Sequence, residues 1–227
     1  MKLKEIDQST HAESAKHVNS SPITYPDERL VAFLQRSFGD RDNNKTKNAL
    51  DIGFGSGRHI QLLIDFCFKT YGIEYTEEAI AVTAKRFRSE NSLQKLLLGD
   101  YRTYKFDVKF DLVIAWGLIF YSTYSEMQKD LIAMANAVND NGRVILNFRT
   151  TENWFYGLGK EVDKNTYLLD ERARAYKGYV YTFLSLDEIK TLISEVGLKI
   201  ECIERIDLWK NQLEERNSWY ICELSKK

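Results

Sequence analysis

The chain has few cysteines, few prolines and no long apolar run. Only three of its 227 residues are cysteine and two are proline. Cys67, Cys202 and Cys222 lie in apolar stretches without metal-ligand spacing, which argues against a disulfide framework or a zinc module and favours reduced core residues. No segment is long and apolar enough to span a membrane, and the polar N-terminus lacks the apolar stretch of a signal peptide. We therefore expect a soluble, cytoplasmic protein without a bound metal.

Neither sign of charge dominates the composition. The chain has 32 basic and 33 acidic side chains, so its formal net charge is −1. No overall field favours a polyanion, and neither nucleic acid nor an anionic membrane is expected as a partner. The length suits a single domain over residues 1–227 with one full core. The composition leaves the oligomeric state open.

Three alternating glycines mark the stretch around which the chain is organised, residues 49–60 (ALDIGFGSGRHI). A short apolar strand carrying Asp51 leads into Gly53, Gly55 and Gly57, and a helix pattern follows. This geometry lets backbone N–H groups approach a ligand closely. The spacing differs from the G-x-G-x-x-G of dinucleotide sites, which points away from NAD. We predict a cofactor site here, with a plain strand-to-helix turn as the alternative.

Two further acids follow at the ends of predicted strands. Glu74 ends the strand 70–74 and lies 23 positions after Asp51, near the offset at which nucleotide-binding α/β domains place an acid on the ribose. Asp100 follows the strand that begins at residue 95. Strands alternate with amphipathic helices throughout residues 49–148, and this pattern predicts a doubly wound parallel sheet.

The two ends of the chain depart from this rhythm. Residues 149–183 are rich in tyrosine and arginine and predict a cap that carries substrate contacts. A capping box opens a helix at 185–197, and strands at 198–208 and 219–224 predict an antiparallel hairpin. Residues 1–22 are polar and aperiodic, as in a flexible segment or a lid, and a helix at 24–38 and a polar loop at 39–44 follow.

These ordered features, from Ala49 to the C-terminus, resemble the class I S-adenosylmethionine (SAM) dependent methyltransferases. The resemblance implies a Rossmann-like, mostly parallel sheet with a C-terminal antiparallel hairpin and a cap insertion, and SAM as the cofactor. It implies that Asp100 accepts from the adenine amino group and that the fourth strand, 110–116, opens onto the methyl-transfer site. The expected cofactor-binding residues are Asp51, Gly53, Phe54, Gly55, Gly57, Glu74, Tyr75, Asp100, Tyr101, Trp116 and Tyr121.

Methyl transfer from a sulfonium is an in-line displacement, so alignment of the acceptor supplies much of the rate. An amine acceptor needs only its neutral form, whereas an alcohol needs a base. We take Tyr121, His17 and Arg149 as the catalytic candidates. Tyr121 can offer its ring face to the sulfonium, His17 can act as a base from the N-terminal segment, and Arg149 can hold a phosphate or carboxylate. His59 more simply lines the cofactor's edge or packs on the sheet.

Other readings of the sequence remain open. A nucleic-acid base methyltransferase is disfavoured, because residues 115–118 read Ala-Trp-Gly-Leu where such enzymes have an Asn/Asp-Pro-Pro-aromatic run. A catalytically silent methyltransferase-fold partner subunit is opposed by the intact Asp51, glycines and Glu74. A NAD-linked oxidoreductase is opposed by the glycine spacing. We predict a SAM-dependent methyltransferase that modifies O or N of a small, including anionic, metabolite.

Overall fold

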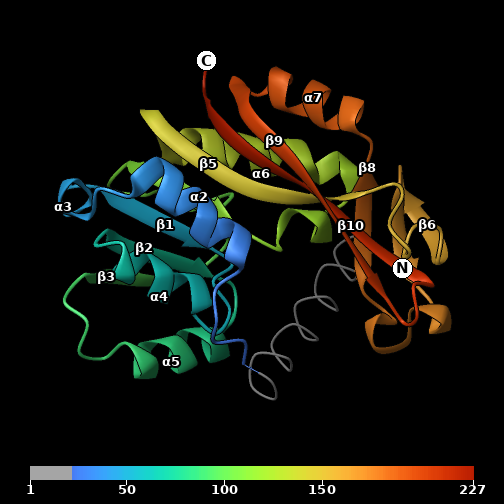
Figure 1. Cartoon of the computed structure of the whole chain (residues 1–227), viewed down its shortest axis with the longest axis horizontal. Helices are drawn as coiled ribbons and strands as arrows, with labels where there is room; N and C mark the ends of the chain where they lie inside the picture. The colour runs from blue at the N-terminus through green and yellow to red at the C-terminus, as the bar shows by residue number, and fades with distance from the viewer. Residues whose placement is uncertain (1–21) are drawn as a thin grey trace.

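The computed structural model describes residues 22–227 and shows a twisted mixed sheet with helices on both faces (Figure 1). Its parallel part has the order β3-β2-β1-β4-β5. These strands are β1 (Asn48–Ile52), β2 (Lys69–Glu74), β3 (Leu93–Leu98), β4 (Phe110–Ala115) and β5 (Val138–Thr150). The predicted doubly wound architecture is confirmed, and the N-terminal segment with His17 lies outside the described residues.

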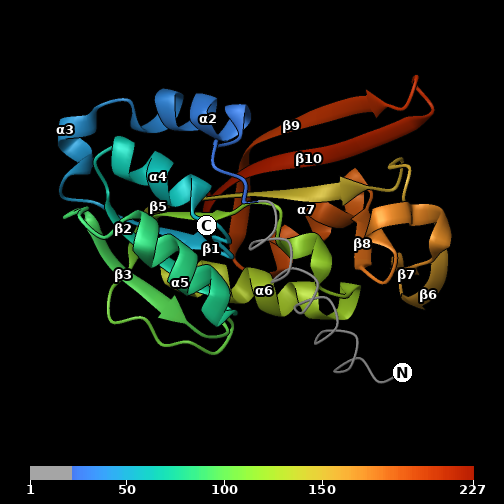
Figure 2. The ribbon, with the colours of Figure 1, turned by 90° about the horizontal axis from the view of Figure 1, so that it is seen from below.

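Two helical layers cover the sheet (Figure 2). One layer contains α2 (Glu28–Phe38), α4 (Arg58–Asp65) and α5 (Glu77–Arg86), and the other contains α6 (Tyr124–Ala137) and α7 (Leu186–Glu195). Apolar side chains of α2 and α4 pack on one face of β1 and β4, and those of α6 and α7 pack on the opposite face. Thr76 and Ser185 cap α5 and α7, and the predicted capping box of Ser185 with Glu188 is present. No helix in residues 22–227 is long and apolar enough to cross a membrane.

The predicted C-terminal hairpin is present and longer than expected. It consists of β9 (Leu198–Lys210) and β10 (Glu215–Lys226), and β10 pairs antiparallel with β5 so that Trp219 lies opposite Arg149. The turn between the strands includes Asn211, Gln212 and Leu213, all at positive φ. The hairpin therefore closes one side of the parallel sheet and projects beyond it (Figure 2).

The segment 149–183, expected as a cap loop, instead contains three strands. They are β6 (Gly159–Asp163), β7 (Thr166–Leu169) and β8 (Val180–Leu184), with the 3-10 helix η2 (Glu171–Tyr176) before β8. β8 pairs in parallel with the last residues of β5, and β7 and β6 continue antiparallel from it. The tyrosines and phenylalanines of this segment bury against one another as a separate aromatic cluster. The lobe is thus an extension of the sheet with its own core.

One local prediction was wrong. The expected polar loop at 39–44 contains the short helix α3 (Arg41–Asn44), because Asp40 caps its N-terminus and the buried Asn44 amide donates to the carbonyls of Phe38 and Phe66. β5 begins directly after α6, at Val138, and its first residues pair with the start of β4.

Candidate cofactor-binding site

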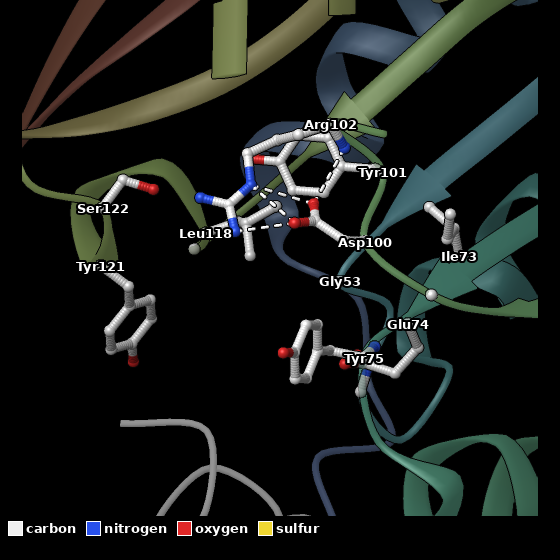
Figure 3. A pocket seen from close by; sticks show the side chains of 13 residues that line it. Gly53, Ile73, Glu74, Tyr75, Asp100, Tyr101, Arg102, Leu118, Tyr121 and Ser122 are labelled. Carbon is white, nitrogen blue, oxygen red and sulfur yellow. Dashed lines mark hydrogen bonds and ion pairs between the residues drawn. The ribbon is translucent and has the colours of Figure 1, made fainter. Parts of the chain in front are cut away.

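A cleft opens at the carboxyl ends of β1, β2 and β4 (Figure 3). In an open α/β sheet this is where ligands bind, beside the point at which the strand order reverses. The cleft is lined by Gly53, Gly55, Ile73, Glu74, Tyr75, Gly99, Asp100, Tyr101, Arg102, Gly117, Leu118, Tyr121 and Ser122. Seven of the eleven residues predicted to bind the cofactor are in this set.

The glycine turn forms one wall of the cleft. Gly53, Gly55 and Gly57 have φ of 69°, 54° and 80°, in the left-handed region that favours glycine. The Gly53 N–H donates to the Ile73 carbonyl at 2.9 Å, which fixes the turn against β2. The turn brings backbone to the cleft where a side chain would obstruct it.

Glu74 lies at the end of β2 and faces the cleft (Figure 3). Its Oε2 accepts from the Gly55 N–H at 2.9 Å and its Oε1 accepts from the Tyr75 N–H at 2.7 Å. These two bonds hold the carboxylate in one orientation against the glycine turn. Each oxygen has a second lone pair, so the group can still accept hydrogen bonds from a diol in the cleft.

Asp51 lies on β1 below the glycine turn and does not line the cleft. It is 1% exposed, and its Oδ2 has no hydrogen-bond partner among the described residues. Burial raises the pKa of Asp51 well above its usual value, Arg58 opposes that shift, and Glu74 adds to it. The raised pKa of Asp51 reflects the cost of burying an ionised carboxylate that lacks a hydrogen-bond partner at one oxygen.

Asp100 forms a bidentate ion pair within the cleft wall (Figure 3). The Arg102 Nε donates to both carboxylate oxygens at 2.9 and 3.0 Å, and Arg102 Nη2 lies 2.8 Å from Oδ2. The hydrogen bonds to Asp100 raise the pKa of Arg102 further above its usual value. Behind this pair, the Tyr101 hydroxyl donates to Asp130 Oδ1 at 2.7 Å.

Two tyrosines approach the cleft from different elements. Tyr75 follows β2 and is 47% exposed at the rim. Tyr121 ends η1 (Ile119–Tyr121), and its ring centroid lies 4.9 Å from that of Phe120 and 5.4 Å from that of Tyr181. Burial raises the pKa of Tyr121, with Arg149 as the first opposing influence, so the phenol stays protonated at neutral pH.

The structure does not bring Trp116 or Phe54 to the cleft. Trp116 is 9% exposed and packs in the core between the sheet and α2, with its ring edge-on to His59 at 6.4 Å. Burial lowers the pKa of His59 to about 3, and Arg58 adds to the shift, so this imidazole stays neutral. Phe54 is buried against Ile60 and Phe87, and Gly57 serves instead as the N-cap of α4.

Arg149 lies near the end of β5, inside the aromatic cluster and outside the residues that line the cleft. Arg149 is 7% exposed. Its Cζ lies 4.1 Å from the Tyr181 ring centroid, 4.5 Å from that of Phe120 and 5.6 Å from that of Trp219. Nε and Nη1 have no hydrogen-bond partner within the described part of the chain. The guanidinium is therefore stabilised by ring faces and not by a carboxylate.

Six lining residues were missed by sequence reasoning: Ile73, Gly99, Arg102, Gly117, Leu118 and Ser122. Two of them carried a usable signal, because Gly99 and Gly117 each stand where a predicted strand ends. A Cβ built on Gly117 meets no atom within 4 Å, and its N–H donates to Asn147 Oδ1 at 2.7 Å. Arg102 gave no signal, because its pairing with Asp100 depends on a loop conformation. In residues 22–227 no group of three His, Cys, Asp or Glu side chains is placed to hold a metal.

The open sheet, the glycine turn and the acid at the end of β2 together define a Rossmann-like fold for a nucleoside-containing cofactor. Residues 49–142 match the family model described as a methyltransferase domain. This match covers the strands and loops that line most of the cleft, and it supports a SAM-dependent methyltransferase with SAM as its cofactor. No curated protein sequence matches it closely enough to count as a relative.

Solved structures show the same fold at low sequence identity. A protein from Pyrococcus horikoshii is 19% identical over 92% of this chain and 93% of its own, with a TM-score of 0.70. The 1,6-didemethyltoxoflavin-N1-methyltransferase from Burkholderia thailandensis, solved with that substrate and S-adenosylhomocysteine (SAH), is 13% identical over 100% and 91%, with a TM-score of 0.73. The N-methyltransferase NodS from Bradyrhizobium japonicum, solved with SAH, is 16% identical over 96% and 98%, with a TM-score of 0.65.

Proposed function

We propose that this enzyme transfers the methyl group of SAM to O or N of a small, anionic metabolite. The acceptor's negative charge is inferred from Arg149, a residue that is 7% exposed and whose Nε and Nη1 have no hydrogen-bond partner and no carboxylate among the described contacts. A buried cation without a counter-anion is costly, and a carboxylate or phosphate of the acceptor would relieve that cost.

The residues that line the cleft are assigned to the different parts of SAM. When bound, SAM supplies an electrophilic methyl on a sulfonium. We assign Glu74 to the ribose hydroxyls, the glycine turn to the backbone approach, and the Asp100–Tyr101 loop to the adenine. Tyr121 stands between the cleft and the aromatic cluster that contains Arg149, which supports its role in orienting the acceptor and excluding water.

N-methylation is the favoured outcome of the two. Neither Tyr121 nor His59 is an effective base: burial keeps the phenol protonated, and a pKa of about 3 makes the neutral imidazole of His59 a weak base, whose Nε2 is enclosed and without a partner among the described residues. An amine needs only its neutral form, whereas an alcohol needs a base. Two of the structurally similar proteins are named as N-methyltransferases.

The test is a binding and turnover experiment on the intact protein. SAM and SAH at 100-fold excess over Kd should each stabilise the fold by about 2.7 kcal/mol. A panel of matched amines and alcohols, each with and without a carboxylate or phosphate, should then show methylation of the anionic amines first. Absence of SAM binding would refute the assignment, and a preference for neutral acceptors would refute the role of the anion.

A further inference from the structure

Asp130 is a buried carboxylate directly behind the cleft wall, and the roles assigned above do not use it. It lies on α6 and is 0% exposed. The Tyr101 hydroxyl donates to its Oδ1 at 2.7 Å, and Tyr101 lines the cleft. Oδ2 has no partner of normal geometry among the described residues, although the nearby Ser122 hydroxyl, also in the cleft wall, stabilises the ionised carboxyl.

The charges around Asp130 are already matched with one another. Arg102 forms its close ion pair with Asp100 at 2.8 Å and lies 3.9 Å from Glu126. Glu126, on the same helix as Asp130, is paired with Lys129 at 2.8 Å. Asp130 itself has no cation within 4 Å in residues 22–227. When it ionises, this wall therefore gains a negative charge that Arg102, already paired with Asp100, attracts only from outside ion-pair distance.

The ionisation of Asp130 occurs close to the working range of a cytoplasmic enzyme. Burial raises the pKa of Asp130 to about 6; the hydroxyls of Ser122 and Tyr101 and the charge of Arg102 oppose the shift, and Asp100 adds to it. The group is thus largely ionised above pH 7. In the interior the effective dielectric constant is far below that of water, so its field extends into the cleft.

We infer that ionised Asp130 makes the cleft discriminate between the cationic sulfonium cofactor and its neutral thioether product. The inference rests on the proposed function, since it concerns the same cleft. SAM and SAH share the adenosine and the amino-acid groups, so hydrogen bonds from Glu74 and Asp100 to those groups do not distinguish the two. They differ by one methyl group and the positive charge on sulfur, and a fixed negative charge distinguishes them.

The charge also changes in the right direction during turnover. The bond from sulfur to the methyl carbon breaks and leaves its electron pair on sulfur, while the methyl carbon bonds to the acceptor, which loses its proton to solvent. Sulfur becomes neutral at that moment, so the attraction to Asp130 disappears. Asp130 therefore favours binding of the substrate form of the cofactor and release of the product form.

The experiment is a calorimetric titration of SAM and of SAH into the full chain between pH 5.5 and 8. The quantity of interest is the ratio of the SAH Kd to the SAM Kd. In the unmodified protein the ratio should rise by about three- to tenfold from pH 5.5 to 8, as expected for charges separated by several ångströms of protein. Asp130→Asn should hold the ratio at its low-pH value throughout.

Two further variants keep the test decisive. Tyr101→Phe removes a hydrogen bond that stabilises the ionised carboxyl, so the rise in the ratio should move to higher pH. Asp111→Asn removes a carboxylate at the far end of β4, where it accepts from the Asn48 N–H at 2.8 Å, and should leave the ratio as in the unmodified protein. If Asp130→Asn does not fold, the direction of the Tyr101→Phe shift decides.

The outcomes separate this inference from the proposed function. Tight binding of both ligands, with a ratio that is flat in pH or unchanged in Asp130→Asn, overturns the inference and leaves the methyltransferase assignment intact. Failure to bind either ligand overturns both. A ratio that falls with rising pH also contradicts a negative charge at this position.

Discussion

Glu74 is the residue on which cofactor affinity should depend most. Glu74→Ala removes the bond from the Gly55 N–H at 2.9 Å and, on the proposed assignment, the acceptor for the ribose hydroxyls. We expect SAM binding to weaken by about 1.5 to 3 kcal/mol, the range for hydrogen bonds to charged groups, measured by calorimetry. The exposed Glu90→Ala serves as the control, and an unchanged SAM affinity in Glu74→Ala contradicts the ribose assignment.

Arg149 should control the acceptor and not the cofactor. Arg149→Lys keeps a positive charge but loses the planar fork that holds two oxygens and stacks on rings, so the KM for an anionic acceptor should rise at least tenfold while the SAM Kd stays put. The exposed Arg172→Lys, in the same lobe, controls for surface charge. Normal acceptor kinetics with SAM binding lost would move Arg149 to the methionine carboxylate.

Measurements of folding and of acceptor kinetics in Arg149→Met can separate acceptor binding by Arg149 from a purely packing role. If the guanidinium serves only to fill the aromatic cluster, Arg149→Met should fold as well as the unmodified protein and retain the acceptor KM. If the anion contact is real, Arg149→Met should lose anionic acceptors while neutral analogues keep their kinetics.

Asp130 should lower stability at neutral pH. Its pKa is raised to about 6 in the folded protein, chiefly by burial, so between pH 4 and 6 the folded state binds more protons than the unfolded state and stability falls as pH rises. A shift of this size corresponds to about 3 kcal/mol. In urea unfolding, Asp130→Asn should gain stability over the unmodified protein by roughly that amount from pH 4 to 7.

The buried His59 makes this a difference measurement. Burial lowers its pKa to about 3, so its contribution to stability is present above the usual histidine pKa and declines as pH falls towards 3. The His59 trend runs opposite to the Asp130 trend in the unmodified protein. Because His59 is present in both the unmodified protein and Asp130→Asn, its contribution cancels in the difference between them. An Asp130→Asn advantage that is equal at pH 4 and pH 7 contradicts the raised pKa of Asp130 in the folded protein.

How far the site could be predicted varies residue by residue, with a physical cause in each case. Glu74 and Asp100 follow from position, because parallel strands end at one edge of the sheet. Trp116 was predicted to line the cleft, but strand side chains alternate between the two faces of a sheet. Trp116 therefore points to the same face as Leu112 and Ile114, which packs against α2 and α4. That alternation was readable in the sequence, whereas the pairing of Arg102 with Asp100 was not.

At the scale of the element, the start of α4 depends on the absence of a side chain at Gly57. A Cβ there lies 2.8 Å from Thr83 Cγ2 and 2.9 Å from Phe87 Cε2, and the backbone has φ of 80°. Gly57→Ala should therefore combine backbone strain with overpacking and cost about 1 to 3 kcal/mol more than Gly178→Ala, measured by urea unfolding. Gly178 has φ of 85° but open space around its Cβ.

The matched pair isolates the packing of α4 against α5. Equal losses in Gly57→Ala and Gly178→Ala would mean that Thr83 and Phe87 move aside without cost. A Gly57→Ala protein that folds but binds SAM poorly would show in addition that the strain reaches the glycine turn.

Elements with local signals were predictable, and those defined by long-range pairing were not. Periodicity and capping identified α2, α5 and α7, because their residues contact neighbours in the same helix. Residues 149–183 looked like a loop, since β8 is recognisable as a strand only beside the end of β5. The aromatic residues that suggested substrate contacts instead form the core of that lobe, with Arg149 at its centre.

At the scale of the whole molecule, the cleft and the aromatic lobe meet at η1. Tyr121 lines the cleft and its ring packs against Tyr181, while the preceding Phe120 contacts Arg149. Under the proposed roles, the cofactor site and the acceptor site would therefore be joined by one short helix at the end of β4. Ligands on the two sides should protect different parts of the chain.

Hydrogen exchange should resolve this division. A ligand that binds only the folded state reduces the local openings that expose amides, in proportion to its occupancy. SAH should slow exchange at 53–57, 99–102 and 117–122 and leave the hairpin turn at 211–214 unchanged. An anionic acceptor added afterwards should slow exchange in 149–183, because it would tie Arg149 to the lobe. Protection of 149–183 by SAH alone would place Arg149 on the cofactor, and absence of protection at 53–57 would contradict the glycine turn as the cofactor site.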